Sequence, residues 1–185
     1  MLEGRLRPTW VLIVLAVLAL PQSVCAQLGL LPPVSTWREY RENDDGFVVR
    51  VPNAVKAREW RDGGRPAGYY VTGNPQQSFS VIAIRWPAGL RAGQAAPAIV
   101  EATTKRILDG MKAEKVERDE PQDCGEGVPG RILKAKLPDD LVYAGRICVT
   151  SGNVYRVEAF IEAAQWDEAD GNVKAFLESF KPLRR

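Results

Sequence analysis

The chain of 185 residues contains no histidine, and this absence removes a large group of catalytic mechanisms. A serine or cysteine nucleophile is most often activated by a neighbouring imidazole, so Ser-His-Asp and Cys-His sites are excluded. The His-rich zinc sites of metallohydrolases are excluded for the same reason. An enzyme built from this sequence could use carboxylates, or a serine and a lysine, in place of imidazole.

Several short motifs are missing as well. The sequence has no G-x-S-x-G nucleophile elbow, no G-x-x-x-x-G-K-[ST] phosphate loop and no N-x-[ST] glycosylation site. It also lacks a dense run of Lys and Arg, and its formal net charge is only +2. Binding to nucleic acid depends on clustered cations. We therefore predict no nucleic-acid partner, no cofactor and no metal site.

What the sequence does contain is an amino-terminal export pattern. Arg5 and Arg7 precede an unbroken apolar run over 10–20, which ends at Pro21. A cleavage site between Ala26 and Gln27 completes the order typical of a secretory signal peptide. The apolar run is shorter than the roughly 20 residues that a membrane-spanning helix needs. We predict a signal peptide over 1–26, a periplasmic or secreted protein, and no integral membrane segment after its removal; an uncleaved anchor is the alternative.

Cysteine is scarce, and its use agrees with export. Cys25 leaves with the signal peptide, so the mature chain keeps only Cys124 and Cys148. An oxidising compartment favours pairing these two residues in a disulfide. Two separate buried thiols are the alternative. The spacing between Cys124 and Cys148 is far from that of a C-x-x-C motif, so we do not expect a redox-active pair.

The mature chain has the length of one domain. Residues 27–36 contain Pro32-Pro33 and are interpreted as a flexible lead-in to a domain over 37–185. Alternating apolar residues and turn signals predict strands followed by a helix, then three strands and a closing helix. Short turns between consecutive strands favour antiparallel pairing. The expected fold class is α+β, with an antiparallel sheet covered by helices; the ranges expected for these elements are 47–51, 55–61, 67–73, 78–86, 96–115, 130–137, 141–150, 153–161 and a helix from Asp167.

The hairpin formed by 55–61 and 67–73 carries the one surface that we nominate for a partner. If Trp60 lies opposite Tyr70, then Lys56 and Arg58 share their face. Aromatic and arginine side chains dominate binding hot spots. The alternative is that Trp60 and Tyr70 form a cross-strand aromatic pair beneath a helix, which would only stabilise the sheet.

Three acidic clusters could in principle serve acid–base chemistry or calcium binding. Asp44-Asp45 and Asp139-Asp140 lie in expected turns, where Asp is favoured for local hydrogen bonds. Asp167 is expected to cap the last helix, with Asp170 in its first turn. None of the three fits the calcium loop of EF-hands. Local turn and cap roles therefore account for these residues.

Two groups of short motifs resemble PsbP-like domains. The first is Trp37-Arg38-Glu39-Tyr40 followed by Gly46-Phe47-Val48-Val49-Arg50-Val51-Pro52; the second is 127–131, 152–157 and 176–181. The resemblance spans most of the mature chain and implies an α/β/α sandwich around an antiparallel sheet. In that fold Phe47, Tyr155, Phe176 and Phe180 would lie in the core. Relatives of this type mostly bind or assemble other molecules, although a fold does not fix a function.

The function expected from these observations is that of an exported, non-enzymatic binding or assembly protein of the bacterial cell envelope. Its partner would be another envelope protein or a small ligand. The alternative is a histidine-free hydrolase or carbohydrate-acting enzyme that uses carboxylates. Hydrolysis of a glycosidic bond by such an enzyme requires two acidic groups that face a cleft, roughly 5–10 Å apart.

Overall fold

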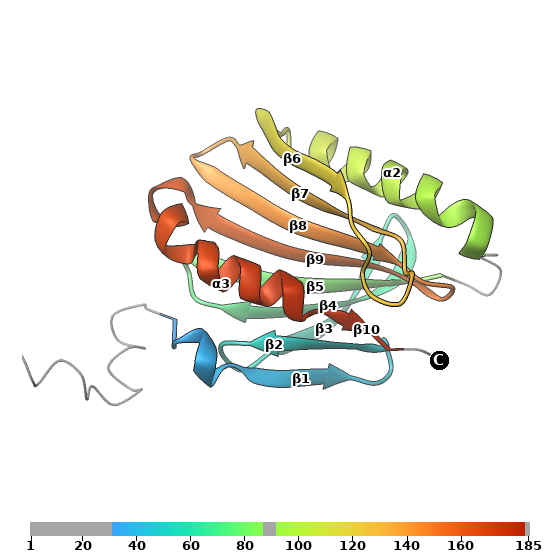
Figure 1. Ribbon diagram of the computed structural model, residues 1–185, viewed down its shortest axis with the longest axis horizontal. Coiled ribbons are helices and arrows are strands. Elements are labelled where there is room, and N and C mark those ends of the chain that lie inside the picture. Colours follow the sequence, from blue (N-terminus) through green and yellow to red (C-terminus); the bar gives the residue numbers. More distant parts are fainter. Residues whose placement is uncertain (1–30, 87–91, 184–185) are drawn as a thin grey trace, which may run out of the picture.

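A computed structural model describes residues 31–86 and 92–183. The predicted signal peptide, including the cleavage site Ala26–Gln27, lies outside the described residues. The described chain forms two antiparallel sheets and two long helices (Figure 1). The small sheet has the order β1-β2-β10, and its strands are Arg38–Glu42, Phe47–Val51 and Lys181–Pro182.

The large sheet has seven strands in the order β3-β4-β5-β9-β8-β7-β6. All of its pairings are antiparallel, as the short turns predicted. Its strands are β3 (Lys56–Asp62), β4 (Arg65–Gly73), β5 (Gln77–Arg85), β6 (Lys115–Pro121), β7 (Gly130–Leu137), β8 (Leu141–Val149) and β9 (Asn153–Glu162). The helices are α2 (Ala92–Gly110) and α3 (Trp166–Ser179).

The two faces of the large sheet are covered by different elements. Helix α3 and the small sheet pack on one face, while α2 packs on the other, mainly over β7 and β8 (Figure 1). Strand β5 shows why both faces need a cover: Phe79 and Val81 point into the α3 side, and Ile82 and Ile84 point into the α2 side. A strand that is apolar on both faces is stable only when it is buried twice.

The helices contribute apolar residues at helical spacing. Val173, Phe176 and Leu177 of α3 are buried on the α3 side, and Val100 and Ile107 of α2 are buried on the α2 side. This spacing places them on one stripe of each helix. The four aromatic residues expected in the core are all at most 2% exposed: Phe47, Tyr155, Phe176 and Phe180.

Three local expectations were wrong. Strand β6 was not predicted, because its residues are all exposed and its charged sequence shows no apolar alternation. Asp167 is not the cap of α3; it lies inside the first turn, where a negative charge still favours the helix dipole. The element expected over 96–115 is helical only as far as Gly110, and Lys115 is the first residue of β6.

The disulfide between Cys124 and Cys148 is present, as predicted. It joins the loop after β6 to the end of β8, and both cysteines are buried. Gly130 is needed beside it, because a Cβ there would overlap the Cys124 sulfur and the Ile147 carbonyl. In the chain-entropy account, closing a loop of this length stabilises the fold by about 3 kcal/mol.

Residues 31–36 of the predicted lead-in take part in the packing. Val34–Thr36 form a short 3-10 helix, and Leu31 and Val34 pack against the α3-side core. The Trp37 indole N–H donates to the Pro32 carbonyl (3.0 Å). Within the described parts of the chain, no helix combines the length and the apolar character needed to cross a membrane.

Candidate functional site

A groove of about 1580 Å³ opens at one end of the large sheet. We call it the end groove. The end of β5, the β8–β9 turn, the loop after β6 and the carboxyl-terminal segment line it; its apolar lining includes Trp86, Val128, Pro129, Phe180 and Pro182. A concave site of mixed apolar and polar lining is the usual location of a small-molecule site.

Arg146 of β8 lies in the wall of the end groove and is 7% exposed. Its guanidinium donates to two main-chain carbonyls, those of Leu177 (3.1 Å) and Asp123 (2.7 Å). Burial lowers the pKa of this arginine, and the charges of Asp123 and Glu178 act in the opposite direction. Arg146 therefore fastens the last turn of α3 and the loop after β6 to the sheet.

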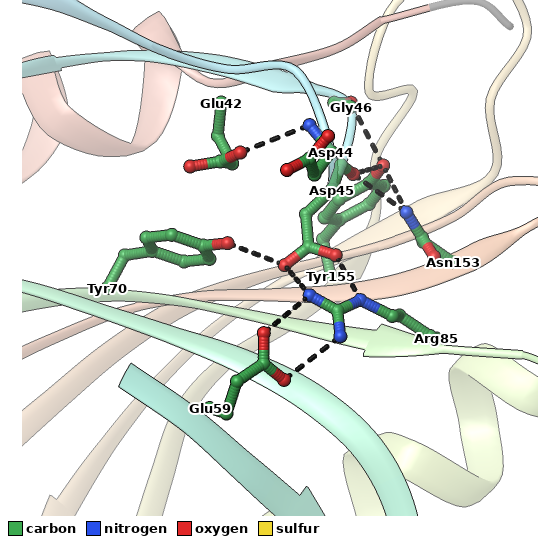
Figure 2. A network of polar contacts seen from close by, with 9 residues as sticks. All are labelled: Glu42, Asp44, Asp45, Gly46, Glu59, Tyr70, Arg85, Asn153 and Tyr155. Atoms are coloured by element: carbon green, nitrogen blue, oxygen red, sulfur yellow. Dashed lines mark hydrogen bonds and ion pairs between the residues drawn. The ribbon is translucent and has the colours of Figure 1, made fainter. Parts of the chain in front are cut away.

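A buried carboxylate, Asp45, lies at the centre of a polar network (Figure 2) that includes Arg85, Asn153 and Tyr155 of the groove lining. Asp45 lies in the β1–β2 turn and is fully buried. It accepts hydrogen bonds from the Tyr70 hydroxyl (2.6 Å) and from Nε of Arg85 (2.6 Å). Arg85 also binds Glu59 through two bonds of 3.0 Å. One arginine thus connects the turn of the small sheet with β5 and β3 of the large sheet.

The main chain of the same turn is held from β9. The Tyr155 hydroxyl and the Asn153 side-chain amide both donate to the Asp45 carbonyl, each at 2.7 Å (Figure 2). We call the whole set, Asp45, Glu59, Tyr70, Arg85, Asn153 and Tyr155, the Asp45 network. It satisfies both the carboxylate and the carbonyl of a buried turn residue, as a buried polar group requires.

Gly68 makes room for this network. A Cβ at Gly68 would overlap the Asp45 carboxylate and the Tyr70 ring. The glycine lies on β4, two residues before Tyr70, so the tyrosine ring can lie flat over it and reach Asp45. A glycine at this position of a strand marks a close approach of another group to the backbone.

The pKa shifts of Tyr70 and Arg85, and of Tyr40 beside the network, favour the ordinary charge states of these three groups. Burial, with the hydrogen bond to Asp45, raises the pKa of Tyr70, and burial with Glu42 raises that of Tyr40 to about 12. The hydrogen bonds to Glu59 and Asp45 raise the pKa of Arg85. Tyrosines that stay neutral and an arginine that stays charged are suited to holding a structure rather than to moving protons near neutral pH.

The aspartates of the two acidic turns have different structural roles. Asp139 and Asp140 occupy left-handed conformations in the β7–β8 turn, which confirms their turn role. For Asp45 a purely local role was the wrong interpretation, since its carboxylate bonds to residues 25 and 40 positions away. Across the described ranges, no three acidic or cysteine side chains converge closely enough to hold a metal ion.

The hairpin register differs from the one that the predicted partner surface assumed. Trp60 lies opposite Ala67, and Tyr70 lies opposite Ala57, so Trp60 and Tyr70 point to opposite faces of the sheet. The reason is the turn: Gly63 and Gly64 both have positive φ and form a two-residue loop. Such a loop fixes the register, and Gly-Gly is a sequence signal for it. A five-residue turn over 62–66 was the wrong prediction.

The other three predicted residues do share one face, and Tyr69 takes the place of Tyr70. The Arg58 guanidinium lies 4.6 Å from the centre of the Tyr69 ring, and the Trp60 and Tyr69 rings are 6.3 Å apart. Arg65, farther along this face, lies 3.7 Å above the Trp86 ring. We call this set the β3 surface: Lys56, Arg58, Trp60, Arg65, Tyr69 and Trp86.

Comparison with known proteins supports the fold. No protein-family model matches the sequence, and no curated protein matches it either. The solution structure of cyanobacterial PsbP (CyanoP) from Synechocystis sp. PCC 6803 is similar, with a TM-score of 0.58 and 15% sequence identity. The similarity covers 84% of this chain and 99% of the cyanobacterial one.

A second similar structure is a protein of unknown function from Pseudomonas aeruginosa, described as a putative regulator. Its TM-score is 0.49 at 13% identity, over 80% of this chain and 99% of that one. At these identities the comparisons concern the fold. The chain has a PsbP-like α+β fold, as its sequence motifs predicted.

Proposed function

We propose that the protein is an exported, non-enzymatic binding or assembly protein of the bacterial cell envelope, and that the β3 surface contacts its partner. The observation that supports this most is the exposure of a surface made of arginines stacked on aromatic rings. Trp60 is 41% exposed, and Lys56 and Arg58 are exposed beside it. Tryptophan, tyrosine and arginine are the residues that contribute most to protein–protein affinity.

The competing interpretation was that the aromatic residues only stabilise the sheet beneath a helix. Tyr70 fits that interpretation, because it is 8% exposed and packs in the α3-side core. Trp60 does not fit it, since it is 41% exposed and the main contacts of α2 are with β7 and β8. The two aromatic residues of the original prediction therefore have separate roles.

The end groove supports a second candidate function, the binding of a small ligand. Its lining combines aromatic and aliphatic surface with Arg146 and with Arg85, Asn153 and Tyr155, which the contacts of the Asp45 network hold in place. Rigid walls favour binding because little conformational entropy is lost when a ligand enters.

Capture in the native host tests the partner surface. The tagged full-length protein is crosslinked in cells, and the captured species are identified by mass spectrometry. We expect one dominant envelope partner that is lost in Arg58→Ala and Trp60→Ala. Val116→Ala is the matched control, because Val116 is 44% exposed on the other edge strand. A partner retained by both β3 variants would contradict the proposed surface.

Export has its own test. The protein is recovered from the envelope fraction of the host, and its amino terminus is sequenced. We expect Gln27 as the first residue. Recovery from the cytoplasm with residues 1–26 intact would contradict export.

A further inference from the structure

Strand β3 is an edge of the large sheet, and it differs from the other edge in a way that points to a partner. In the described chain β3 pairs only with β4, so one side of its main chain has no neighbouring strand. Its residues 56–61 are exposed, and its ladder with β4 is regular over all seven pairs. An edge of this kind can accept another strand.

The opposite edge, β6, is protected. A bulge interrupts its ladder between Val116 and Arg118, and a proline ends the strand. Its acidic side chains are paired: Glu117 with Lys134 (3.2 Å), and Asp119 with Arg131. A bulge and a proline are among the usual means by which an edge strand avoids unwanted pairing, and β3 has neither.

The charges of the β3–β4 hairpin are unbalanced. Both of its acidic residues are paired with arginines of other elements, Glu59 with Arg85 and Asp62 with Arg106. Its cations have no carboxylate within ion-pair distance among the described residues; they are Lys56, Arg58, Arg61 and Arg65. The hairpin is therefore a basic edge with an exposed tryptophan.

We infer that β3 binds an extended acidic segment of the partner protein, which adds to the sheet as an eighth strand. This inference rests on the proposed function and names the chemistry of the partner. Strand addition gains affinity from main-chain hydrogen bonds, and alternate side chains provide specificity. Asp or Glu at alternate positions of the added strand would lie beside Lys56 and Arg58, on the face that also carries Trp60.

A second copy of this chain suits the edge less well than an acidic segment does. It would bring its own four unpaired cations to the interface, and like charges across paired strands are destabilising. A hollow of about 280 Å³ beside Trp60, lined also by Glu59, Arg61 and Pro66, gives room for side chains of the added strand.

Peptides of the length of β3 test the inference with the mature protein. The probe is a fluorescently labelled, capped peptide of alternating Glu and Val, measured by anisotropy. The first control peptide has Lys in place of Glu. The second keeps Glu but carries N-methyl groups on alternate main-chain nitrogens, which removes hydrogen-bond donors without changing the charge.

We expect the Glu peptide to bind, and both control peptides to bind at least about tenfold more weakly. Arg58→Glu should weaken binding of the Glu peptide by about tenfold, whereas Arg118→Glu on β6 should leave it unchanged. Circular dichroism checks that both variants are folded.

Three results would overturn strand addition: no binding of the Glu peptide, equal binding of the N-methylated peptide, or equal effects of the two arginine variants. Self-association of the protein through β3, seen as a dimer that Arg58→Glu disrupts, would also overturn it. The proposed function is tested by a different result. A cellular partner whose capture depends on Trp60 would support the β3 surface even if the peptide did not bind.

Discussion

The Asp45 network and a second buried network around Glu158 use similar sets of residues for different purposes. Each places a carboxylate, a tyrosine and an arginine around a strand glycine. In the second network Glu158 accepts hydrogen bonds from Tyr143 (3.3 Å) and Arg156 (2.8 Å). Gly145 makes room for the Tyr143 hydroxyl, as Gly68 does for Tyr70.

The two networks differ in what they connect. Glu158, Tyr143 and Arg156 lie on neighbouring strands of one sheet, β8 and β9, beneath α2. Asp45 instead joins a turn of the small sheet to the large sheet, through residues far apart in sequence. The Glu158 network lies within one face of the large sheet. The Asp45 network instead holds the two sheets together and contributes residues to the lining of the end groove.

Removing the Asp45 carboxylate should have the largest effect. Asp45→Ala leaves the Tyr70 hydroxyl and Arg85 without their buried acceptor, and we expect the free energy of unfolding to fall by about 3 kcal/mol. Urea unfolding measures the loss. Asp44→Ala is the control, because Asp44 is exposed in the same turn, and its effect should be well under that of Asp45→Ala. Equal losses would contradict the assigned role of Asp45.

Glycine-to-alanine substitutions beside the two tyrosines allow a direct comparison of the two networks. Gly68→Ala and Gly145→Ala should each lower the free energy of unfolding by about 2 kcal/mol, since the new Cβ overlaps a buried tyrosine. Gly68→Ala should cost more, because its Cβ also meets the Asp45 carboxylate. Thermal and urea unfolding measure both. Gly152→Ala, whose Cβ meets nothing within 4 Å, should be close to neutral.

A difference in pH dependence is the smallest expected effect. Burial raises the pKa of Glu158 above its usual value of 4.5, against the opposing effect of Arg156. As pH rises from about 4.5, the unfolded chain ionises first, so the wild type loses stability relative to Glu158→Gln until pH passes the folded pKa. Unfolding of both proteins at several pH values measures this. A constant difference between them would contradict the raised pKa.

Much of the fold could be predicted from the sequence, because apolar alternation and turn residues act locally. The strands over 130–161 and the apolar stripe of α3 follow from such signals, and the disulfide follows from the two cysteines that remain after the predicted export signal. Strand β6 could not be recognised, since it is held by its pairing with β7 and by charge pairs rather than by burial.

The candidate site was harder to predict. Its essential contacts are long-range, and nothing near Asp45 in sequence indicates that Arg85 will reach it. The partner surface was predicted in part: Lys56, Arg58 and Trp60 share a face, but a three-residue difference in register replaces Tyr70 with Tyr69. Register decides the face of every side chain in a strand, and here the Gly63-Gly64 loop decides the register.

Site-specific photocrosslinking in the native host tests the central claim most directly. A photoreactive amino acid is placed at position 60 or, as the control, at position 116, two sites of similar exposure on opposite edges of the sheet. The account predicts a crosslink to one envelope protein from position 60 and none to it from position 116. Crosslinks to the same protein from both positions, or from position 116 alone, would contradict a partner at the β3 surface.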